Sequence, residues 1–227
     1  MVVIVGVLVA LGVNSWATER GDRTLENQYL ERLARDFRQD SIALAEFRRS
    51  AERGEEAGLE LLALLKGSAE APDAHVSRLL GAATRDAYVI PNTPTIEDLK
   101  SSGNLRVIED ATKRDAVLTY YSQVSGYQRV LETLMRRGKD PLGELGWDIG
   151  GFDPDISFAV GRGRDSLEVA SAAALDDQRH GSLLSRLESR PEAERVTRRS
   201  ITYNSMLQTA LSRWEHSLLE ARAKIVD

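Results

Sequence analysis

Few residues of this 227-residue chain have the type and spacing that catalysis or metal binding needs. The three histidines, His75, His180 and His216, lie far apart and form none of the paired spacings that bind zinc, so we expect them on helix surfaces. Cysteine is absent, which excludes cysteine nucleophiles and cysteine-ligated zinc. The sequence therefore predicts no metal site and no cofactor.

Two further motifs could suggest chemistry, but an ordinary structural role explains each of them better. Gly161-Arg-Gly163-Arg precedes a predicted helix, as phosphate-binding loops do, yet no strand precedes it and the Walker lysine is missing. Lys100 beside Ser101 and Ser102 has the composition of a Ser–Lys hydrolase pair, but these residues end a short predicted helix. No acid, base and nucleophile converge, so we expect a protein that is not an enzyme.

The best candidate for a binding site is the segment 88–104, together with tyrosines of the long helix that follows it. Pro91 and Pro94 hold this segment extended. Asp40 interrupts the apolar stripe of the first long helix and could face the same space. A pocket for a small molecule or a peptide would use the following polar side chains: Tyr88, Thr95, Ser101, Ser102, Asn104, Tyr120, Tyr127 and Asp40.

The same residues also allow a purely structural interpretation. Tyrosines on a helix stripe are mostly core residues, and backbone carbonyls or threonine hydroxyls of the Pro-Asn-Thr-Pro segment would satisfy their hydroxyls. Asp40 would then reach a helix edge, pair with an arginine or serve a function, in that order of expectation. The sequence leaves the binding and the structural interpretations open.

Helices with apolar residues at 3-4 spacing must position these side chains, and no strand-like alternation of convincing length occurs. Thr95 and Asp98 resemble a capping box at the start of a short helix, and Gly103 predicts its end. A connection rich in Gly and Asp is expected over residues 138–164. We expect the helices at residues 24–66, 75–87, 96–102, 109–137, 167–180 and 192–225.

The predicted fold class is all-α. We expect an N-terminal transmembrane helix that continues into an antiparallel helical bundle of about four main helices plus short helices. The predicted domain boundaries are a transmembrane anchor at residues 1–17 and a helical-bundle domain at residues 18–227.

The apolar N-terminal segment carries no polar side chain from Met1 to Val13, and Trp16 closes it. A membrane-spanning helix needs about 20 apolar residues, so this run is short and its start could lie upstream of Met1. A cleaved signal peptide is one alternative, although a basic region is missing; an apolar helix buried against a partner is another. We expect an anchor in the lipid bilayer through residues 1–17, with Trp16 at the membrane interface.

The charge balance limits the class of partner. The chain has 30 Lys and Arg against 35 Asp and Glu, a net charge of −5, which argues against nucleic acid as a partner. The basic cluster Arg195, Arg198 and Arg199 is expected to be a solvated helix face, with anionic lipid or an acidic partner as the alternative.

Several stretches carry a resemblance to a known family. Val13-Asn14-Ser15-Trp16 ends the apolar segment, residues 95–121 contain Leu-Lys-Ser-Ser-Gly-Asn-Leu before a helix with Tyr-Tyr, and Tyr29-Leu30 is followed by Leu33 and Asp36. These stretches resemble a bacterial family of single-pass membrane proteins, domain of unknown function 6090. The family's anchor typically ends in Asn-Asn-Trp-Asn-Glu, so Ser15 and Ala17 depart from it. The resemblance covers about the first 135 residues.

The resemblance implies a location and no activity. Family members usually begin with a basic cytoplasmic stretch, which this chain lacks, so a truncated start is expected. The protein would lie in the bacterial inner membrane as a single-pass protein, with its soluble domain in the periplasm. We expect a non-catalytic envelope interaction or scaffold module that binds a protein partner or forms a homo-oligomer. The alternative is a periplasmic ligand-sensing domain of four-helix type that acts with a separate transducer.

Overall fold

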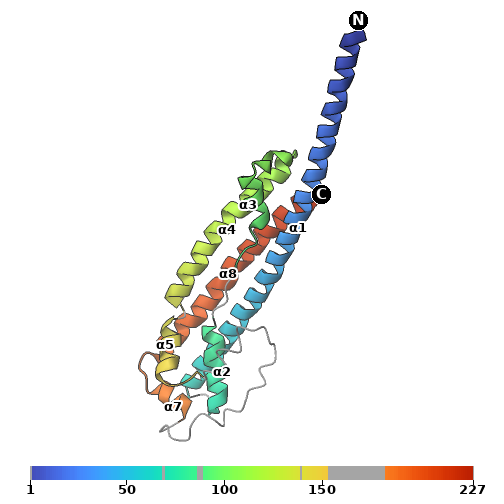
Figure 1. Cartoon of the computed structure of the whole chain (residues 1–227). Coiled ribbons are helices and arrows are strands. Elements are labelled where there is room, and N and C mark those ends of the chain that lie inside the picture. Colours follow the sequence, from blue (N-terminus) through green and yellow to red (C-terminus); the bar gives the residue numbers. More distant parts are fainter. Residues whose placement is uncertain (1, 68–69, 86–88, 139, 153–181, 227) are drawn as a thin grey trace. The chain divides into compact units, whose positions relative to one another are not determined.

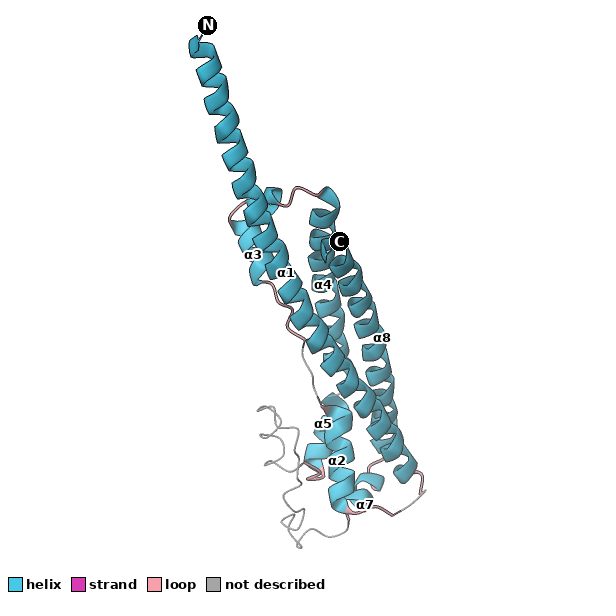
Figure 2. Cartoon of the chain, turned by 90° about the vertical axis from the view of Figure 1, so that its right-hand side faces the viewer, coloured by secondary structure: helices cyan, strands magenta, loops and turns pink. Residues whose placement is uncertain are grey.

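The regular structure of the protein is helical throughout the residues that the structure describes. The computed structural model describes residues 2–67, 70–85, 89–138, 140–152 and 182–226, and no strand occurs within them (Figures 1 and 2). The predicted all-α class is confirmed. The helices are α1 (Val2–Leu65), α2 (Asp73–Thr84), α3 (Pro94–Ser101), the 3-10 helix η1 (Asn104–Val107), α4 (Ala111–Gly138), α5 (Asp140–Asp148), α7 (Leu183–Glu188) and α8 (Ala193–Val226).

Helix α1 is continuous from Val2 to Leu65, so the apolar N-terminal segment and the first long amphipathic helix form one element. Gly67, with a φ of 75°, ends it in the left-handed conformation that glycine favours. Within the described part of the chain, none of the helices combines the length and the apolar character that crossing a membrane requires.

Two compact units make up the chain, and the three long helices contribute to both. Unit 1 contains Met1–Leu44, Val89–Gly126 and Arg213–Asp227, and unit 2 contains Ala45–Tyr88 and Tyr127–Ser212.

Unit 1 has a core of apolar residues spaced by three and four on its long helices. The backbone N–H of Glu109 donates to Glu26, and the hydroxyl of Tyr120 donates to Asp40, so α4 runs parallel to α1 here. Helix α8 runs against both, as the antiparallel prediction expected, whereas the α1–α4 pair departs from it (Figure 1). The buried apolar side chains include Leu33, Phe37, Leu44, Ile96, Leu99, Ile108, Val117, Val124, Trp214, Leu218 and Ile225.

Unit 2 depends on a close approach of α1 to α8. Gly54 and Gly58 permit this approach because neither has a Cβ atom. A Cβ at Gly54 would lie 2.8 Å from Asn204 Oδ1, and one at Gly58 would lie 2.7 Å from Ile201 Cγ1. The side chain of Asn204 occupies the space at Gly54 and donates to the carbonyls of Ala83 and Ser200. The glycines that thin the apolar stripe of α1 therefore serve packing.

Helix α5 corrects one expectation, since residues 138–164 were predicted to be a connection. Residues 140–148 are helical because Leu142, Leu145 and Ile149 follow the spacing of one helix face and are buried. Pro141 is compatible with this helix because it lies in the first turn, where its missing N–H leaves no bond unmade. The predicted helix 167–180 lies outside the described residues.

The start of α3 also differs from the prediction. The helix begins at Pro94 with Thr93 as its N-cap residue, so Thr95 and Asp98 do not form the expected capping box. Proline at the first helical position explains the shift, because its fixed φ is already that of a helix. The predicted end is confirmed: Gly103 adopts a φ of 73° just after the helix.

The glycine contacts generate a paired prediction. Gly54→Ala is expected to lower the free energy of unfolding by about 1–3 kcal/mol, because the new methyl group displaces the bonded amide of Asn204. Gly126→Ala, in the middle of α4, is the matched control, because nothing beyond the neighbouring helix backbone lies within 4 Å of the new methyl group. This variant is expected to raise the free energy of unfolding by about 0.5–1 kcal/mol. Urea denaturation measures both variants, and equal effects would contradict the packing role of Gly54.

Candidate functional site

Asp40 is the centre of a buried polar cluster in unit 1. Its side chain is 0% exposed, and both carboxylate oxygens accept hydrogen bonds. Oδ1 accepts from the backbone N–H of Asn92 at 2.8 Å and from the Asn92 side-chain amide at 2.8 Å. Oδ2 accepts from the hydroxyl of Tyr120 at 2.7 Å. Three donors from two other parts of the chain therefore converge on one carboxylate of α1.

The extended segment before α3 brings Asn92 to Asp40. Pro91 precedes Asn92, and Pro94 follows shortly after, so the backbone here cannot coil into a helix before α3 begins. Tyr121 adds a third bond to the same residue, because its hydroxyl donates to the carbonyl of Asn92 at 2.9 Å. Asn92 is thus held through its N–H, its side chain and its carbonyl.

Successive tyrosines on α4 reach different partners because neighbouring helix positions point about 100° apart. Tyr120 faces Asp40, and Tyr121 faces the segment 89–93. The two rings pack edge to face with centroids 5.0 Å apart, and Phe37 of α1 packs on Tyr120 at 4.8 Å. Such aromatic pairs add packing energy to the area they bury.

Trp214 extends the cluster to α8. Its indole Nε1 donates to the hydroxyl oxygen of Tyr120 over 3.3 Å, and the tryptophan is fully buried. The order of donors is therefore Trp214 to Tyr120 to Asp40. A carboxylate suits the end of this series, because it only accepts hydrogen bonds and each neighbour that reaches it offers a proton.

The electrostatic consequence is that the tyrosines remain protonated. The pKa of Tyr120 lies far above its ordinary value. Burial is the largest cause, and the charge of the adjacent Asp40 carboxylate is the second. Burial raises the pKa of Tyr121 in the same way, with the charges of Asp36 and Asp40 adding to it. Both hydroxyls therefore act as hydrogen-bond donors at any physiological pH.

Asp40 itself is subject to opposing effects. Burial raises the pKa of its carboxyl group, the bonds from Asn92 and Tyr120 lower it, and the nearby charge of Asp36 raises it again; the net direction is upward. Asp36 lies one turn earlier on α1, and its Oδ2 atom is buried with no hydrogen-bond partner among the described residues. Two carboxyl groups thus share one poorly solvated region.

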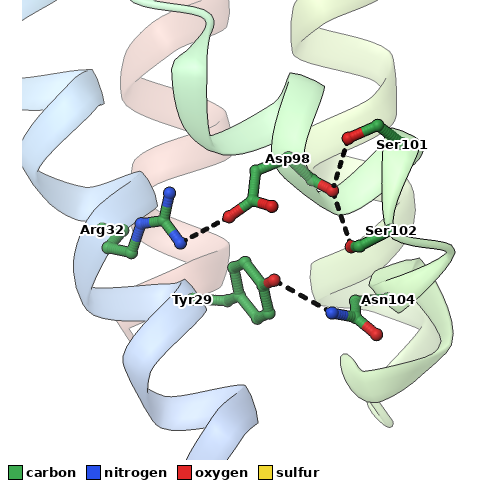
Figure 3. Close-up of polar contacts among 6 residues, drawn as sticks. All are labelled: Tyr29, Arg32, Asp98, Ser101, Ser102 and Asn104. Atoms are coloured by element: carbon green, nitrogen blue, oxygen red, sulfur yellow. Dashed lines mark hydrogen bonds and ion pairs between the residues drawn. The ribbon is translucent and has the colours of Figure 1, made fainter.

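A second polar cluster fixes α3 and η1 to α1 nearer the surface (Figure 3). Arg32 pairs with Asp98 at 2.7 Å, and the side-chain amide of Asn104 donates to the hydroxyl of Tyr29 at 3.0 Å. The hydroxyls of Ser101 and Ser102 both donate to the backbone carbonyl of Asp98. The serines therefore cap the end of their own helix.

The predicted site residues do not all meet. Tyr120 and Asp40 contact each other directly, and Thr95 is buried at the start of α3. Asn104, Ser101 and Ser102 belong to the surface cluster of Figure 3. Tyr127 belongs to unit 2, and Tyr88 lies outside the described residues. The predicted pocket residues therefore do not form one site: only Asp40 and Tyr120 meet in the buried cluster, and Ser101, Ser102 and Asn104 lie in the cluster nearer the surface.

The two roles that were expected first for Asp40, reaching a helix edge and pairing with an arginine, are both wrong. Asp40 neither reaches a helix edge nor pairs with an arginine, because the donors that reach its carboxylate oxygens are the uncharged groups of Asn92 and Tyr120. Asn92 and Trp214 are members of the cluster that the sequence did not single out. The signal for Asn92 was its place between two prolines; for Trp214 it was a ring with an N–H on a core stripe.

Other predicted features lie elsewhere. His75 contacts Glu60 at 2.7 Å and His216 contacts Glu220 at 3.1 Å, while His180 and the Gly161–Gly163 motif lie outside the described residues. Across the described ranges, no three His, Asp or Glu side chains come together in a way that could hold a metal ion. Trp16 is 59% exposed, and the guanidinium of Arg20 lies 5.4 Å from its ring centroid.

Comparison with known proteins gives no match: no protein-family model, no curated protein and no solved structure matches this chain. The resemblance to the single-pass family therefore stays a prediction from the residues quoted above.

The buried cluster predicts a large difference between two aspartates of unit 1. Asp40→Ala is expected to lower the free energy of unfolding by about 2–5 kcal/mol, because the donors of Asn92 and Tyr120 lose their acceptor in a buried region. Asp98→Ala removes a half-exposed ion pair and is expected to cost at most about 1 kcal/mol. Denaturant midpoints at constant m-value measure the difference. Similar losses in both variants would contradict the role of Asp40.

Proposed function

We propose that this protein is a non-catalytic, membrane-anchored module that works by binding a protein partner or a second copy of itself in the bacterial envelope, with its helical domain on the periplasmic side. The observation that carries the proposal is that the polar side chains of the predicted site are already hydrogen-bonded within the chain. Asp40, Tyr120, Ser101, Ser102 and Asn104 all form hydrogen bonds with groups of their own chain. A catalytic acid or base must instead reach the proton it transfers.

The anchor is supported by the sequence of residues 1–17 and by the exposure of the helix that follows. Every residue from Ala17 to Thr24 is exposed, and Tyr29 is the first buried one among the described side chains of α1. Tyr29 follows Trp16 by 13 helical positions, which corresponds to about 20 Å at 1.5 Å per residue. A helix with solvated sides over this length suits a spacer between the bilayer surface and the packed part of unit 1.

The exposed tryptophan supports the same placement. Indole rings favour the membrane–water interface, and an arginine beside the ring suits the phosphate level of the headgroups. Trp16 and Arg20 form such a pair on one face of α1.

A ligand-sensing domain that acts with a separate transducer is the second candidate. The observation that favours it is the buried Oδ2 atom of Asp36, which accepts no hydrogen bond from the described residues. A small amine or other cationic donor would satisfy this acceptor. A library of such compounds that leaves the melting temperature of the full chain unchanged would count against this candidate.

The experiment that tests the proposal is chemical crosslinking in native membranes, followed by affinity purification of the full chain. We expect one stoichiometric partner, or a crosslinked dimer, and we expect the protein in the membrane fraction. Leu8→Arg places a charge in the middle of the apolar segment, which costs about 2.5–3.5 kcal/mol on insertion scales, and should move the protein to the soluble fraction.

The matched control is Leu59→Arg, because Leu59 is an exposed leucine of the same helix far from the apolar segment. This variant should remain in the membrane fraction. Equal distribution of wild type and both variants in the soluble fraction would remove the anchor from the proposal. Recovery of the protein without any stoichiometric partner or dimer would contradict the binding role.

A further inference from the structure

The exposed side of α5 carries an aromatic ring between two acids. Glu144, Trp147 and Asp148 are three and four residues apart, so they share one side of the helix. Leu142 and Leu145, on the other side, are buried. All three residues of the first group are exposed, and neither carboxylate forms a hydrogen bond or an ion pair with another described residue. We call Glu144, Trp147 and Asp148 the acidic face.

The ring of Trp147 is held in its exposed position. Trp147 is 58% exposed, and the ring of Phe152 packs against it with centroids 5.2 Å apart and planes tilted by 55°. Gly146 permits this contact, because a Cβ atom there would collide with the Phe152 ring. The N–H groups of Gly150 and Gly151 donate to the carbonyls of Trp147 and Gly146 and so turn the chain back after α5. A fixed, exposed indole is typical of the anchor residues of protein interfaces.

A face of opposite charge lies near the start of α8. Four exposed residues follow one another at spacings of four, three and four, which places them on one side of the helix: Arg195, Arg199, Thr202 and Met206. Neither Arg195 nor Arg199 has a hydrogen-bond or ion-pair partner among the described residues, whereas the neighbouring Arg198 is paired with Glu194. We call these four residues the basic face.

Both faces belong to unit 2, and α5 and the start of α8 lie at the same end of that unit (Figures 1 and 2). We propose that unit 2 carries a self-complementary docking surface, in which the acidic face of one copy binds the basic face of a second copy and the reverse contact completes the dimer. The inference rests on the proposed function, because it specifies how a second copy of the chain would be bound.

The chemistry of the two faces matches. An arginine guanidinium stacks on an indole ring and pairs with a carboxylate at its edge, and Glu144 and Asp148 provide a carboxylate on either side of Trp147. Met206, which is 52% exposed, adds apolar surface beside the arginines. Tryptophan, arginine and methionine are the residue types enriched at protein interfaces.

The pair of opposite charges favours a second copy as the occupant. An anionic lipid or an acidic protein would use the basic face alone and would be repelled by the acidic face. A second copy carries both charge signs at the same positions, so a two-fold arrangement forms the same contact twice.

Site-directed crosslinking tests the contact in the full chain, because the sequence contains no cysteine that would react elsewhere. Gly143→Cys introduces a thiol one turn before Trp147, and Thr202→Cys introduces one on the basic face. The two variants would carry different tags, be produced together and be treated in native membranes with a short bis-maleimide. We expect several-fold more crosslinked mixed dimer than with Gly143→Cys and Thr133→Cys, the latter at an exposed residue of α4 in the same unit.

Charge reversal provides a test with its own rescue. Glu144→Lys with Asp148→Lys makes both faces basic, and Arg195→Glu with Arg199→Glu makes both faces acidic. Each double variant alone is expected to lose the dimer, whereas a mixture of the two should form a mixed dimer again. The changed side chains are exposed and have no partner within the described chain, so folding should be unaffected. Trp147→Ala is expected to raise the dissociation constant of the wild-type dimer about tenfold, measured by sedimentation in detergent.

The outcomes separate this inference from the proposed function. A dimer in native membranes that neither double variant weakens would overturn the docking surface and leave the binding role intact. A different stoichiometric protein partner without any dimer would also overturn the docking surface alone. Recovery of the chain with neither a dimer nor a partner would contradict both proposals.

Discussion

A carboxylate without water around it is the constraint on which unit 1 depends. Asp40 is fully buried, and a buried charge is tolerated only when hydrogen bonds replace its hydration. The chain supplies them from a proline-flanked segment and from α4, and α8 supports the α4 donor through Trp214. One side chain of α1 therefore determines where three other parts of the chain must lie.

Unit 2 is organised by a different constraint, the distance between two helix backbones. Gly54 and Gly58 remove the side chains that would keep α1 and α8 apart, and Asn204 uses the space to bond the end of α2 through the carbonyl of Ala83. Ser200 donates to the same carbonyl. A helix end that would otherwise leave a carbonyl unpaired inside the unit is satisfied by two side chains of α8. The same contact thus gives close packing and satisfies the carbonyl of Ala83, while Asn204 Oδ1 is buried without a hydrogen-bond partner among the described residues.

The two polar clusters of unit 1 differ in how much their contacts contribute to stability. The ion pair of Arg32 with Asp98 and the hydrogen bond from Asn104 to the buried Tyr29 hold α3 and η1 on α1. Solvent competes for the half-exposed ion pair, which is therefore worth little. The buried cluster around Asp40 has no such competition, so its hydrogen bonds are costly to lose. The tyrosines of this cluster stay protonated, because burial raises the pKa of both. The ion pair near the surface therefore contributes less to the stability of unit 1 than the hydrogen bonds buried around Asp40.

The sequence by itself determined the helical class and most of the helix positions. The 3-4 apolar spacing predicted α1, α4 and α8 closely, because amphipathic periodicity is a local property that packing then uses. It also marked Asp40, Tyr120 and the Pro-Asn-Thr-Pro segment as unusual. It missed α5, where Gly143 and Gly146 hid the spacing of Leu142, Leu145 and Ile149. Only the tertiary structure decided that Asn92, rather than an arginine, satisfies Asp40, and that Ser101 and Ser102 cap their own helix. The choice among possible donors depends on which residues far apart in the chain become neighbours, and local periodicity contains no information about that.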